Sequence, residues 1–221
     1  MWSNKLHISK EGIMFITILG IVAFASIFLF TLINYTIIAI IGSFSFILFI
    51  FTIYFFRDPE RIPPEMENAI LSPADGTIIL IDEVYEGVYL KEKGKMVSIF
   101  LSLFNVHINR IPISGVIEHL KYEKGNFYPA FLKKSSLINE NYSIGIANGK
   151  HKIFFRQIAG ILARRIINNL KPGEKVIKGK RFGMIKFGSR MDIFMPMSFK
   201  VTVKLNQKVI GCETIIGVLS Q

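Results

Sequence analysis

The chain has 221 residues, of which 51% are hydrophobic and 20 are Phe, and its mean hydropathy is +0.42. This composition is too apolar for an ordinary soluble domain. The 27 Lys and Arg outnumber the 16 Asp and Glu, for a formal net charge of +11. A single cysteine, Cys212, excludes an internal disulfide and fits a reducing compartment.

Two uncharged segments lie near the start of the chain. Residues 12–33 and 35–56 have 22 residues each, which is about 33 Å as a helix and enough to cross a bilayer core of about 30 Å. A signal peptide would have a shorter apolar region followed by a small-residue cleavage site, whereas this stretch continues almost unbroken. The sequence therefore predicts a membrane anchor over residues 1–56, a transmembrane helical hairpin.

The charges around this hairpin predict its orientation. Lys5 and Lys10 precede the first apolar segment, Arg57 and Arg61 follow the second, and the turn between them has no Lys or Arg. The positive-inside rule therefore places both ends in the cytoplasm. We expect the chain in the cell inner (plasma) membrane with its main domain on the cytoplasmic side. A re-entrant hairpin that does not fully cross would give the same orientation.

The rest of the chain is predicted to form one domain, residues 69–221, after a proline-rich charged linker, residues 57–68. Short apolar runs separated by turns such as Asp75-Gly76 predict strands. One segment, residues 157–170, has the apolar spacing of a helix. The predicted fold class is therefore α+β: the helical hairpin, then a β-rich domain with one mid-length helix.

Residues 57–221 carry almost the whole charge excess. Only Lys5, Lys10 and Glu11 among the charged residues precede position 57. A basic domain tethered to a membrane most simply faces anionic lipid headgroups. Nucleic acid is the competing partner for such a charge, but the sequence has no zinc-finger spacing, RNA-binding motif or helix-turn-helix signal. We therefore expect anionic membrane lipids, and no nucleic acid, as partners.

The pair Gly188-Ser189, within KRFGMIKFGSRMD, is capable of unusual chemistry. The Ser189 hydroxyl can attack the carbonyl of Gly188, because glycine has no side chain to block the attack and tolerates a strained backbone. Loss of the serine α-proton would then eliminate the ester and leave dehydroalanine, which hydrolyses to a pyruvoyl group. For a bare Gly-Ser pair, a simple turn between strands is the ordinary alternative.

Two further residues are candidates to assist this serine. His107 follows an apolar strand and Asp75 lies in the sequence SPADG. A carboxylate that orients an imidazole, which in turn deprotonates a hydroxyl, would be a working set with Ser189. Each also has a structural alternative, as a hydrogen-bonded histidine and as the aspartate of an Asp-Gly turn. The histidines and carboxylates show no metal-ligand spacing, so no metal site is predicted.

In these motifs the chain resembles the short, membrane-anchored prokaryotic form of the phosphatidylserine decarboxylase family, in its uncleaved proenzyme state. The resemblance runs through the whole length and is most specific around the Gly-Ser pair. It is carried by FFRDPER, SPADG, FNVHINRIP, NFYPAF with Asn139-Glu140, RQIAGILARRI and KRFGMIKFGSRMD.

The resemblance implies a pyruvoyl-dependent carboxy-lyase that makes phosphatidylethanolamine. Its cofactor would be a covalent pyruvoyl group formed from Ser189 by self-cleavage after Gly188, with no PLP and no metal. The products would be a large chain, 1–188, with the anchor, and a small chain, 189–221. The substrate amine would form a Schiff base with the pyruvoyl group. Residues 69–221 would be the catalytic domain, with His107 and Asp75 beside the serine.

One position departs from the long-form relatives of this family. They carry a second histidine in HxxHxP, whereas this chain reads HINRIP with Arg110 in that place. Whether His107 acts in both maturation and substrate protonation stays open, and so does a homo-oligomer. Two other functional classes also remain: a pyruvoyl decarboxylase of a soluble amino acid, and a membrane-anchored adaptor in which Gly188-Ser189 is only a turn.

Overall fold

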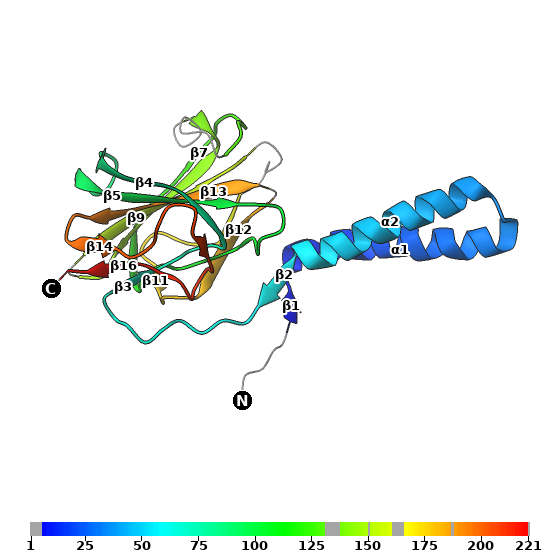
Figure 1. The fold of residues 1–221 in the computed structure, drawn as a ribbon, viewed down its shortest axis with the longest axis horizontal. Coiled ribbons are helices and arrows are strands. Elements are labelled where there is room, and N and C mark those ends of the chain that lie inside the picture. The colour runs from blue at the N-terminus through cyan, green and yellow to red at the C-terminus, as the bar shows by residue number, and fades with distance from the viewer. Residues whose placement is uncertain (1–5, 131–137, 150, 161–165, 187, 221) are drawn as a thin grey trace. The chain divides into compact units, whose positions relative to one another are not determined.

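The structure is a computed structural model that describes residues 6–130, 138–149, 151–160, 166–186 and 188–220 (Figure 1). By its internal contacts the chain divides into two compact units, Met1–Glu60 and Arg61–Gln221. The first unit is mainly helical and the second consists mainly of antiparallel strands.

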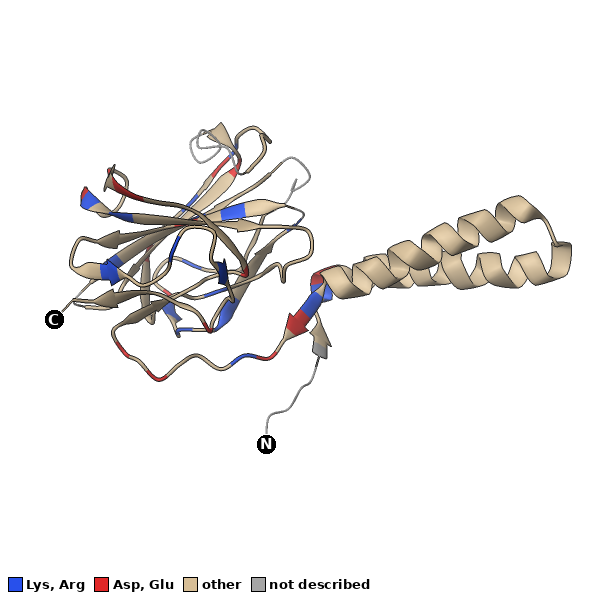
Figure 2. Ribbon diagram, viewed as in Figure 1, with Lys and Arg blue, Asp and Glu red and all other residues tan. Residues whose placement is uncertain are grey.

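The first unit contains the two predicted apolar helices, α1 (Lys10–Ile33) and α2 (Thr36–Phe55). Both are long and apolar enough to cross a membrane, and Figure 2 shows no charged residue along them beyond the first turn of α1. Asn34 ends α1 with a left-handed φ of 52°, which allows the chain to reverse. These helices indicate that the protein associates with a membrane.

Small residues bring the two helices close together. A Cβ added to Gly20 would lie 3.1 Å from the ring of Phe49, and one added to Gly42 would lie 3.1 Å from Ser26. Such small residues at a helix–helix contact are typical of membrane helices, because van der Waals packing replaces the hydrophobic effect there. The residues beside the helices pair as strands β1 (Leu6–Ile8) and β2 (Arg57–Pro59), so the predicted linker begins with a short strand.

The second unit is built on one antiparallel sheet with eight strands. In spatial order they are β11 (Lys175–Val176), β7 (Gly115–Glu123), β8 (Asn141–Ala147), β9 (Lys152–Ile158), β13 (Ser189–Pro196), β5 (Glu92–Leu101), β4 (Gly76–Glu86) and β15 (Lys208–Val209). The sheet curls into a half-barrel. Strand β13 lies near its centre and pairs with β5 on one side and β9 on the other.

Two smaller antiparallel sheets complete the domain. One has the order β10 (Ile166–Asn168), β12 (Arg181–Ile185) and β6 (Ile108–Arg110); the other has the order β14 (Phe199–Val201), β16 (Ile215–Leu219) and β3 (Ala69–Leu71). One apolar core joins all three sheets, with Ile99 from β5, Phe182 from β12 and Ile216 from β16 among its members. The prediction of a β-rich domain after two apolar helices is confirmed.

The predicted helix over residues 157–170 is wrong. Gln157 and Ile158 end β9, and residues 166–168 form β10, while residues 161–165 lie outside the described part of the chain. Ile158 pairs with Asn141 on one side and Arg190 on the other. Pairing on both sides satisfies the backbone and buries the β-branched side chain, which outweighs the local helical spacing.

Candidate active site

Ser189 is the first residue of the central strand β13 and is completely buried. It pairs with Leu101 at the end of β5. Its Oγ has no hydrogen-bond partner among the residues that the structure describes. A buried hydroxyl without a partner costs free energy, so a group of this kind is a candidate for a reactive role.

The alternation along β13 places Ser189 on the inner face of the large sheet. Met191, Ile193 and Met195 share its parity and belong to the main core. Arg190 and the residues that share its parity lie on the opposite, outer face. The serine hydroxyl therefore faces the space enclosed by the three sheets.

Gly188, which precedes the serine, has a left-handed φ of +63°. A side chain rarely adopts this conformation, so glycine suits the position. A Cβ added to Gly188 would meet no atom within 4 Å among the described residues. The preference for glycine here therefore comes from the φ angle rather than from crowding.

The neighbours of the Gly188 carbonyl come from a distant part of the sequence. Arg190 pairs with Ile158, which brings the residues after β9 beside the residues before β13. A Cβ added to Gly160 would overlap the Gly188 carbonyl oxygen. No local sequence signal predicts this approach, because it depends on the register of two strands.

His107 is completely buried and its ring orientation is fixed from one side. The Nδ1 atom lies 2.9 Å from the carbonyl oxygen of Asn105. A carbonyl can only accept, so Nδ1 carries the proton and Nε2 of the neutral ring carries the lone pair. Nε2 is therefore the nitrogen able to act as a base.

The turn that carries His107 is held by the side chain of Asn105. Its Oδ1 accepts hydrogen bonds from the Ser102 backbone N–H at 2.9 Å and from the Ser102 hydroxyl at 2.7 Å. Asn105 thus fixes the turn through its side chain and the imidazole through its backbone. Sequence reasoning did not single out Asn105, although it lies two residues before the histidine.

His107 and Ser189 lie in two neighbouring connections, each of which runs between the large sheet and one small sheet. Strands β5 and β13 pair in the large sheet, where Leu101 lies opposite Ser189. Strands β6 and β12 pair in a small sheet, where Ile108 lies opposite Met184. The connection from β5 to β6 contains His107, and the connection from β12 to β13 ends at Ser189, so the two connections run beside each other.

Asp75 lies in the predicted turn before β4, and its carboxylate contacts Arg61. Arg61 Nη2 donates to Asp75 Oδ2 at 2.8 Å and Nη1 bonds Oδ1, which makes a bidentate pair. The Gly211 backbone N–H also donates to Oδ1, at 2.8 Å. Burial lowers the pKa of Arg61, but the hydrogen bond and charge of Asp75 outweigh it and raise that pKa. The described partners of the Asp75 carboxylate are thus Arg61 and Gly211.

Asp75 and His107 are nevertheless connected through the backbone. The N–H of Arg110, three residues after His107, donates to the Pro73 carbonyl at 2.8 Å. Arg110 itself is buried, and its Nη1 donates to the Gly179 carbonyl at 3.2 Å. Arg110 therefore joins β6 to the residues before β12.

A buried acid that sequence reasoning did not single out is Glu140. Burial raises the pKa of its carboxyl above the usual range, although hydrogen bonds from the Tyr122 hydroxyl and the Ile166 backbone N–H oppose this shift. Its backbone N–H and carbonyl bond Asn126 and Ala159, which precedes Gly160. The only sequence signal for it was its place in the motif Asn139-Glu140.

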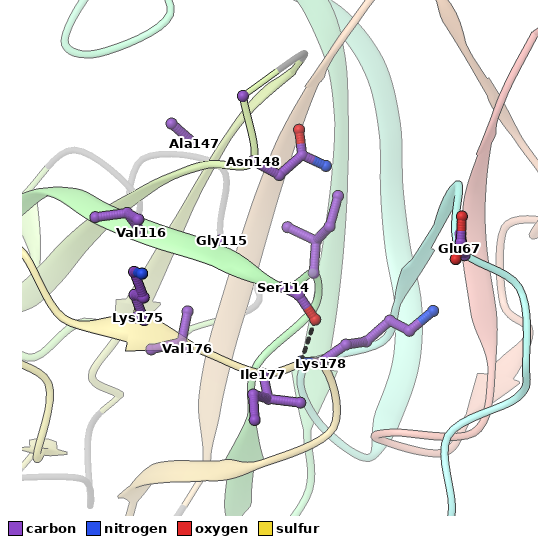
Figure 3. Close-up of a pocket in the computed structure, with 12 residues that line it drawn as sticks. Glu67, Ser114, Gly115, Val116, Ala147, Asn148, Lys175, Val176, Ile177 and Lys178 are labelled. Atoms are coloured by element: carbon purple, nitrogen blue, oxygen red, sulfur yellow. Dashed lines mark hydrogen bonds between the residues drawn. The ribbon is translucent and has the colours of Figure 1, made fainter.

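One well-formed hollow lies elsewhere in the domain. It has a volume of about 800 Å³ and its lining includes Ser114, Asn148, Lys175 and Lys178 (Figure 3). Ala147 in this lining pairs with Lys152, at the start of β9, whereas Ser189 lies beside the end of β9. Six steps along the strand, from Lys152 to Ile158, separate these two ends by roughly 20 Å. This hollow is therefore not the surroundings of the serine.

Comparison with known proteins identifies the family of this arrangement. The sequence profile of the phosphatidylserine decarboxylase family matches residues 48–217. A phosphatidylserine decarboxylase proenzyme of Carboxydothermus hydrogenoformans is 43% identical over 215 residues, covering 97% of this chain and 97% of the relative. The proenzyme of Chlorobium phaeobacteroides (strain DSM 266) is 51% identical, over 76% of this chain and 79% of the relative. The proenzyme of Ehrlichia ruminantium (strain Gardel) is 41% identical, over 99% of this chain and 94% of the relative.

Proposed function

Because the chain belongs to the phosphatidylserine decarboxylase family and is a carboxy-lyase acting on phosphatidylserine, we propose that Ser189 is the residue that becomes its pyruvoyl group. The relatives are named proenzymes, which implies that the active group arises by self-cleavage. The single observation that carries the assignment is the buried Oγ of Ser189 without a described hydrogen-bond partner, directly after a glycine with a left-handed φ.

The proposed maturation uses only groups of this chain and water. Ser189 Oγ attacks the Gly188 carbonyl carbon while His107 Nε2 takes the hydroxyl proton. The carbon–nitrogen bond breaks, the serine nitrogen takes a proton, and an ester remains. Removal of the Ser189 α-proton expels the Gly188 carboxylate and leaves dehydroalanine. Its imine tautomer takes up one water and releases one ammonia, which leaves a pyruvoyl group on residue 189.

The site fits the pyruvoyl group that the family uses. It would be held by the backbone of β13, between β5 and β9, with no metal and no PLP required. A bound pyruvoyl group supplies an electrophilic carbonyl that holds the substrate amine and accepts the electrons released when carbon dioxide leaves. His107, whose imidazole can hold and release a proton, is the proposed donor of the proton that replaces the carboxylate.

The two chains produced by cleavage are proposed to stay together without a covalent link. The large chain, 1–188, provides β5 and β9, which flank β13 of the small chain, 189–221. The small chain also pairs β15 with β4 and β16 with β3, both from the large chain. Removal of β13 would expose the middle of a sheet, so we expect dissociation only on unfolding.

We propose that residues 1–56 anchor the enzyme in the inner membrane with residues 69–221 on the cytoplasmic side. The two apolar helices and the Lys and Arg residues at their ends support this orientation. Anchoring raises the local concentration of a substrate that is itself confined to the bilayer. The net positive charge also favours anionic lipids near the domain.

The composition of the purified protein tests the serine assignment. We expect two fragments in place of one 25.2 kDa chain, the smaller beginning at residue 189. Its N-terminus should be blocked to sequencing, and its mass should fall short of the Ser189–Gln221 peptide by one ammonia, about 17 Da. Cyanoborohydride with phosphatidylserine should label this fragment and abolish activity. An intact, active chain with an ordinary Ser189 would overturn the assignment.

A truncated chain tests the membrane proposal. Deletion of residues 1–56 should release the domain from vesicles that contain anionic lipid at high salt, but only partly at low salt. Salt screens charges over about 10 Å at 0.1 M, so the residual binding should fall as ionic strength rises. Binding that ignores salt would contradict the proposed role of the basic surface.

A further inference from the structure

Gly160 lies directly against the bond that is proposed to break. A Cβ at position 160 would overlap the Gly188 carbonyl oxygen and lie 3.1 Å from the Gly188 carbonyl carbon. The same Cβ would lie 3.4 Å from Ala130 Cβ, so an added methyl group has little freedom to turn away from the carbonyl. Because Gly160 has no side chain, the Gly188 carbonyl oxygen can occupy the position where a Cβ would otherwise lie.

The segment that ends at Gly160 is fixed by a buried asparagine. Asn139 Nδ2 donates to the carbonyls of Ala159 at 2.7 Å and Tyr128 at 2.8 Å, and its Oδ1 accepts from the Tyr128 N–H at 3.0 Å. The Ala159 N–H donates to the Glu140 carbonyl at 2.9 Å. The residue before Gly160 is therefore held through both its N–H and its carbonyl, which leaves Gly160 little freedom to retreat.

The two glycines beside the cut thus face opposite steric situations. Position 188 has room for a methyl group among the described residues, although its φ of +63° disfavours any side chain. Position 160 has no room, because the scissile carbonyl fills the place of the methyl group. The orientation of the Gly188 carbonyl is consequently set by Gly160 across the strand pair as well as by the φ of Gly188 itself.

We propose that Gly160, held through Ala159 by Asn139, is a positioning residue that aims the Gly188 carbonyl at Ser189 Oγ. The proposal rests on the proposed self-cleavage and concerns its first step. In that step the Oγ–carbon bond forms, the carbon–nitrogen bond breaks, and the hydroxyl proton ends on the serine nitrogen by way of His107. Gly160 and Asn139 exchange no proton and form no bond to the reacting atoms.

The test follows the cleavage rate of the full chain synthesised in a cell-free system with detergent. Gly160→Ala should lengthen the half-time of cleavage about 100-fold, because displacement of a reacting group by about 1 Å has an effect of this size. Gly188→Ala should slow cleavage at most about tenfold, since only its φ is unfavourable. Gly87→Ala is the matched control, because its Cβ would make an ordinary 3.5 Å contact with Tyr85, and it should cleave at the wild-type rate.

Two readouts separate positioning from a general loss of structure. Under mild, near-neutral conditions hydroxylamine cleaves an ester but leaves peptide bonds intact, so it should not restore cleavage at residue 189 in Gly160→Ala if the acyl shift is the blocked step. The fraction that does mature should retain wild-type activity per mole of pyruvoyl group, because the Gly188 carboxylate is then a free chain end. Rescue by hydroxylamine, or a matching loss of activity per pyruvoyl group, would overturn the proposal.

A second variant covers the case in which Gly160→Ala does not fold. Asn139→Ala removes the bond to the Ala159 carbonyl but leaves the bond from Ala159 N–H to Glu140, so the strand keeps one of its attachments. It should slow cleavage by a smaller factor, again without rescue by hydroxylamine. A folded Gly160→Ala or Asn139→Ala protein that cleaves at the wild-type rate would contradict the positioning role but not the proposed function. A wild-type chain that does not cleave at residue 189 would overturn the proposed function itself.

Discussion

The two faces of strand β13 carry buried polar groups that differ in their hydrogen bonding. On the inner face, Ser189 Oγ is buried without a hydrogen-bond partner among the described residues. On the outer face, Arg190 Nε donates to Asp192 Oδ1 at 2.6 Å and Arg190 Nη2 donates to Ser98 Oγ at 2.8 Å. All four of these side chains are almost completely buried. One strand therefore places an unsatisfied hydroxyl and a paired set of charges back to back.

This difference favours the proposed chemistry on the inner face and a role in stability for the outer face. A buried polar group without a partner costs free energy, so removing it does not weaken the fold. A buried charge with a partner depends on that partner, and loss of one member leaves the other uncompensated. We therefore expect substitutions on the inner face to affect cleavage and those on the outer face to affect unfolding.

The largest effect is expected for Ser189→Ala. It should leave one uncleaved chain of 25.2 kDa with no decarboxylase activity. Since the lost hydroxyl has no described partner, its unfolding temperature should be no lower than that of the wild type. A gel, an assay of carbon dioxide release and a thermal melt in detergent measure the three outcomes.

Ser98→Ala is the matched control on the other face. Ser98 is also completely buried in the sheet, but its hydroxyl accepts the hydrogen bond of Arg190. We expect normal cleavage and a loss of stability of about 1–3 kcal/mol, the usual effect of leaving a buried donor unsatisfied. Equal behaviour of the two serine variants in both assays would contradict the division between the faces.

The next effect concerns the outer ion pair. Asp192→Asn keeps the shape of the side chain but removes the negative charge that pairs with Arg190, which should lower the free energy of unfolding by about 3–5 kcal/mol. The chain should still cleave after Gly188. Denaturant unfolding in detergent, combined with a gel, measures both.

A double variant sharpens this test. Arg190→Met with Asp192→Leu removes both charges and should recover most of the lost stability, because apolar groups of similar volume can replace a buried pair. If the double variant were as unstable as Asp192→Asn, uncompensated charge would not be the cause.

Asp75 tests whether a paired carboxylate also belongs to the chemistry. Its described partners, Arg61 and Gly211, suggest that Asp75→Asn slows cleavage less than His107→Ala, which removes the proposed base. If the ion pair acts as a unit, Arg61→Met should have a similar effect, and the double variant should be no slower than either single variant. Cleavage half-times of the four variants measure this, and an effect of Asp75→Asn alone would favour a direct role beside His107.

The parts of the molecule that could be predicted from sequence are those set by local composition or chemistry. The apolar runs predicted α1 and α2, and at Gly188 the structure has a left-handed φ of +63°, which glycine adopts readily. The predicted helix over 157–170 is wrong because the spacing of apolar residues is helical, whereas strand pairing on both sides of Ile158 places the start of the segment in β9. The roles of Ser189, His107 and Asp75 stay predictions.

Contacts across strands could not be predicted. Gly160 meets Gly188, and Asn139 holds Ala159, only because β8, β9 and β13 pair in one register. A single sequence contains no signal for that register. The pairing of Asp75 with Arg61 likewise joins a linker residue to the turn before β4, and neither has a distinctive signal in the sequence.

The smallest expected effect concerns Glu140, an acid two residues before Tyr142, which packs against the main core. Asp192 pairs with the charged Arg190 side chain, whereas Glu140 receives hydrogen bonds from the neutral Tyr122 hydroxyl and the Ile166 N–H. Burial raises the pKa of the Glu140 carboxyl. A carboxyl whose pKa is higher in the folded than in the unfolded state destabilises the fold above its folded pKa. That cost disappears as the pH falls below the unfolded pKa.

Glu140→Gln should therefore melt at a higher temperature than the wild type at pH 8, with the difference shrinking as the pH falls towards 4. The amide oxygen can still accept both hydrogen bonds, so only the charge is removed. The gain should be smaller than the losses expected for Ser98→Ala and Asp192→Asn, because the two retained donors already offset part of the cost of burial. Thermal melts from pH 4 to 8 measure it, with Glu65→Gln, whose residue is exposed, as the control. A gain independent of pH would show that the Glu140 charge is not its origin.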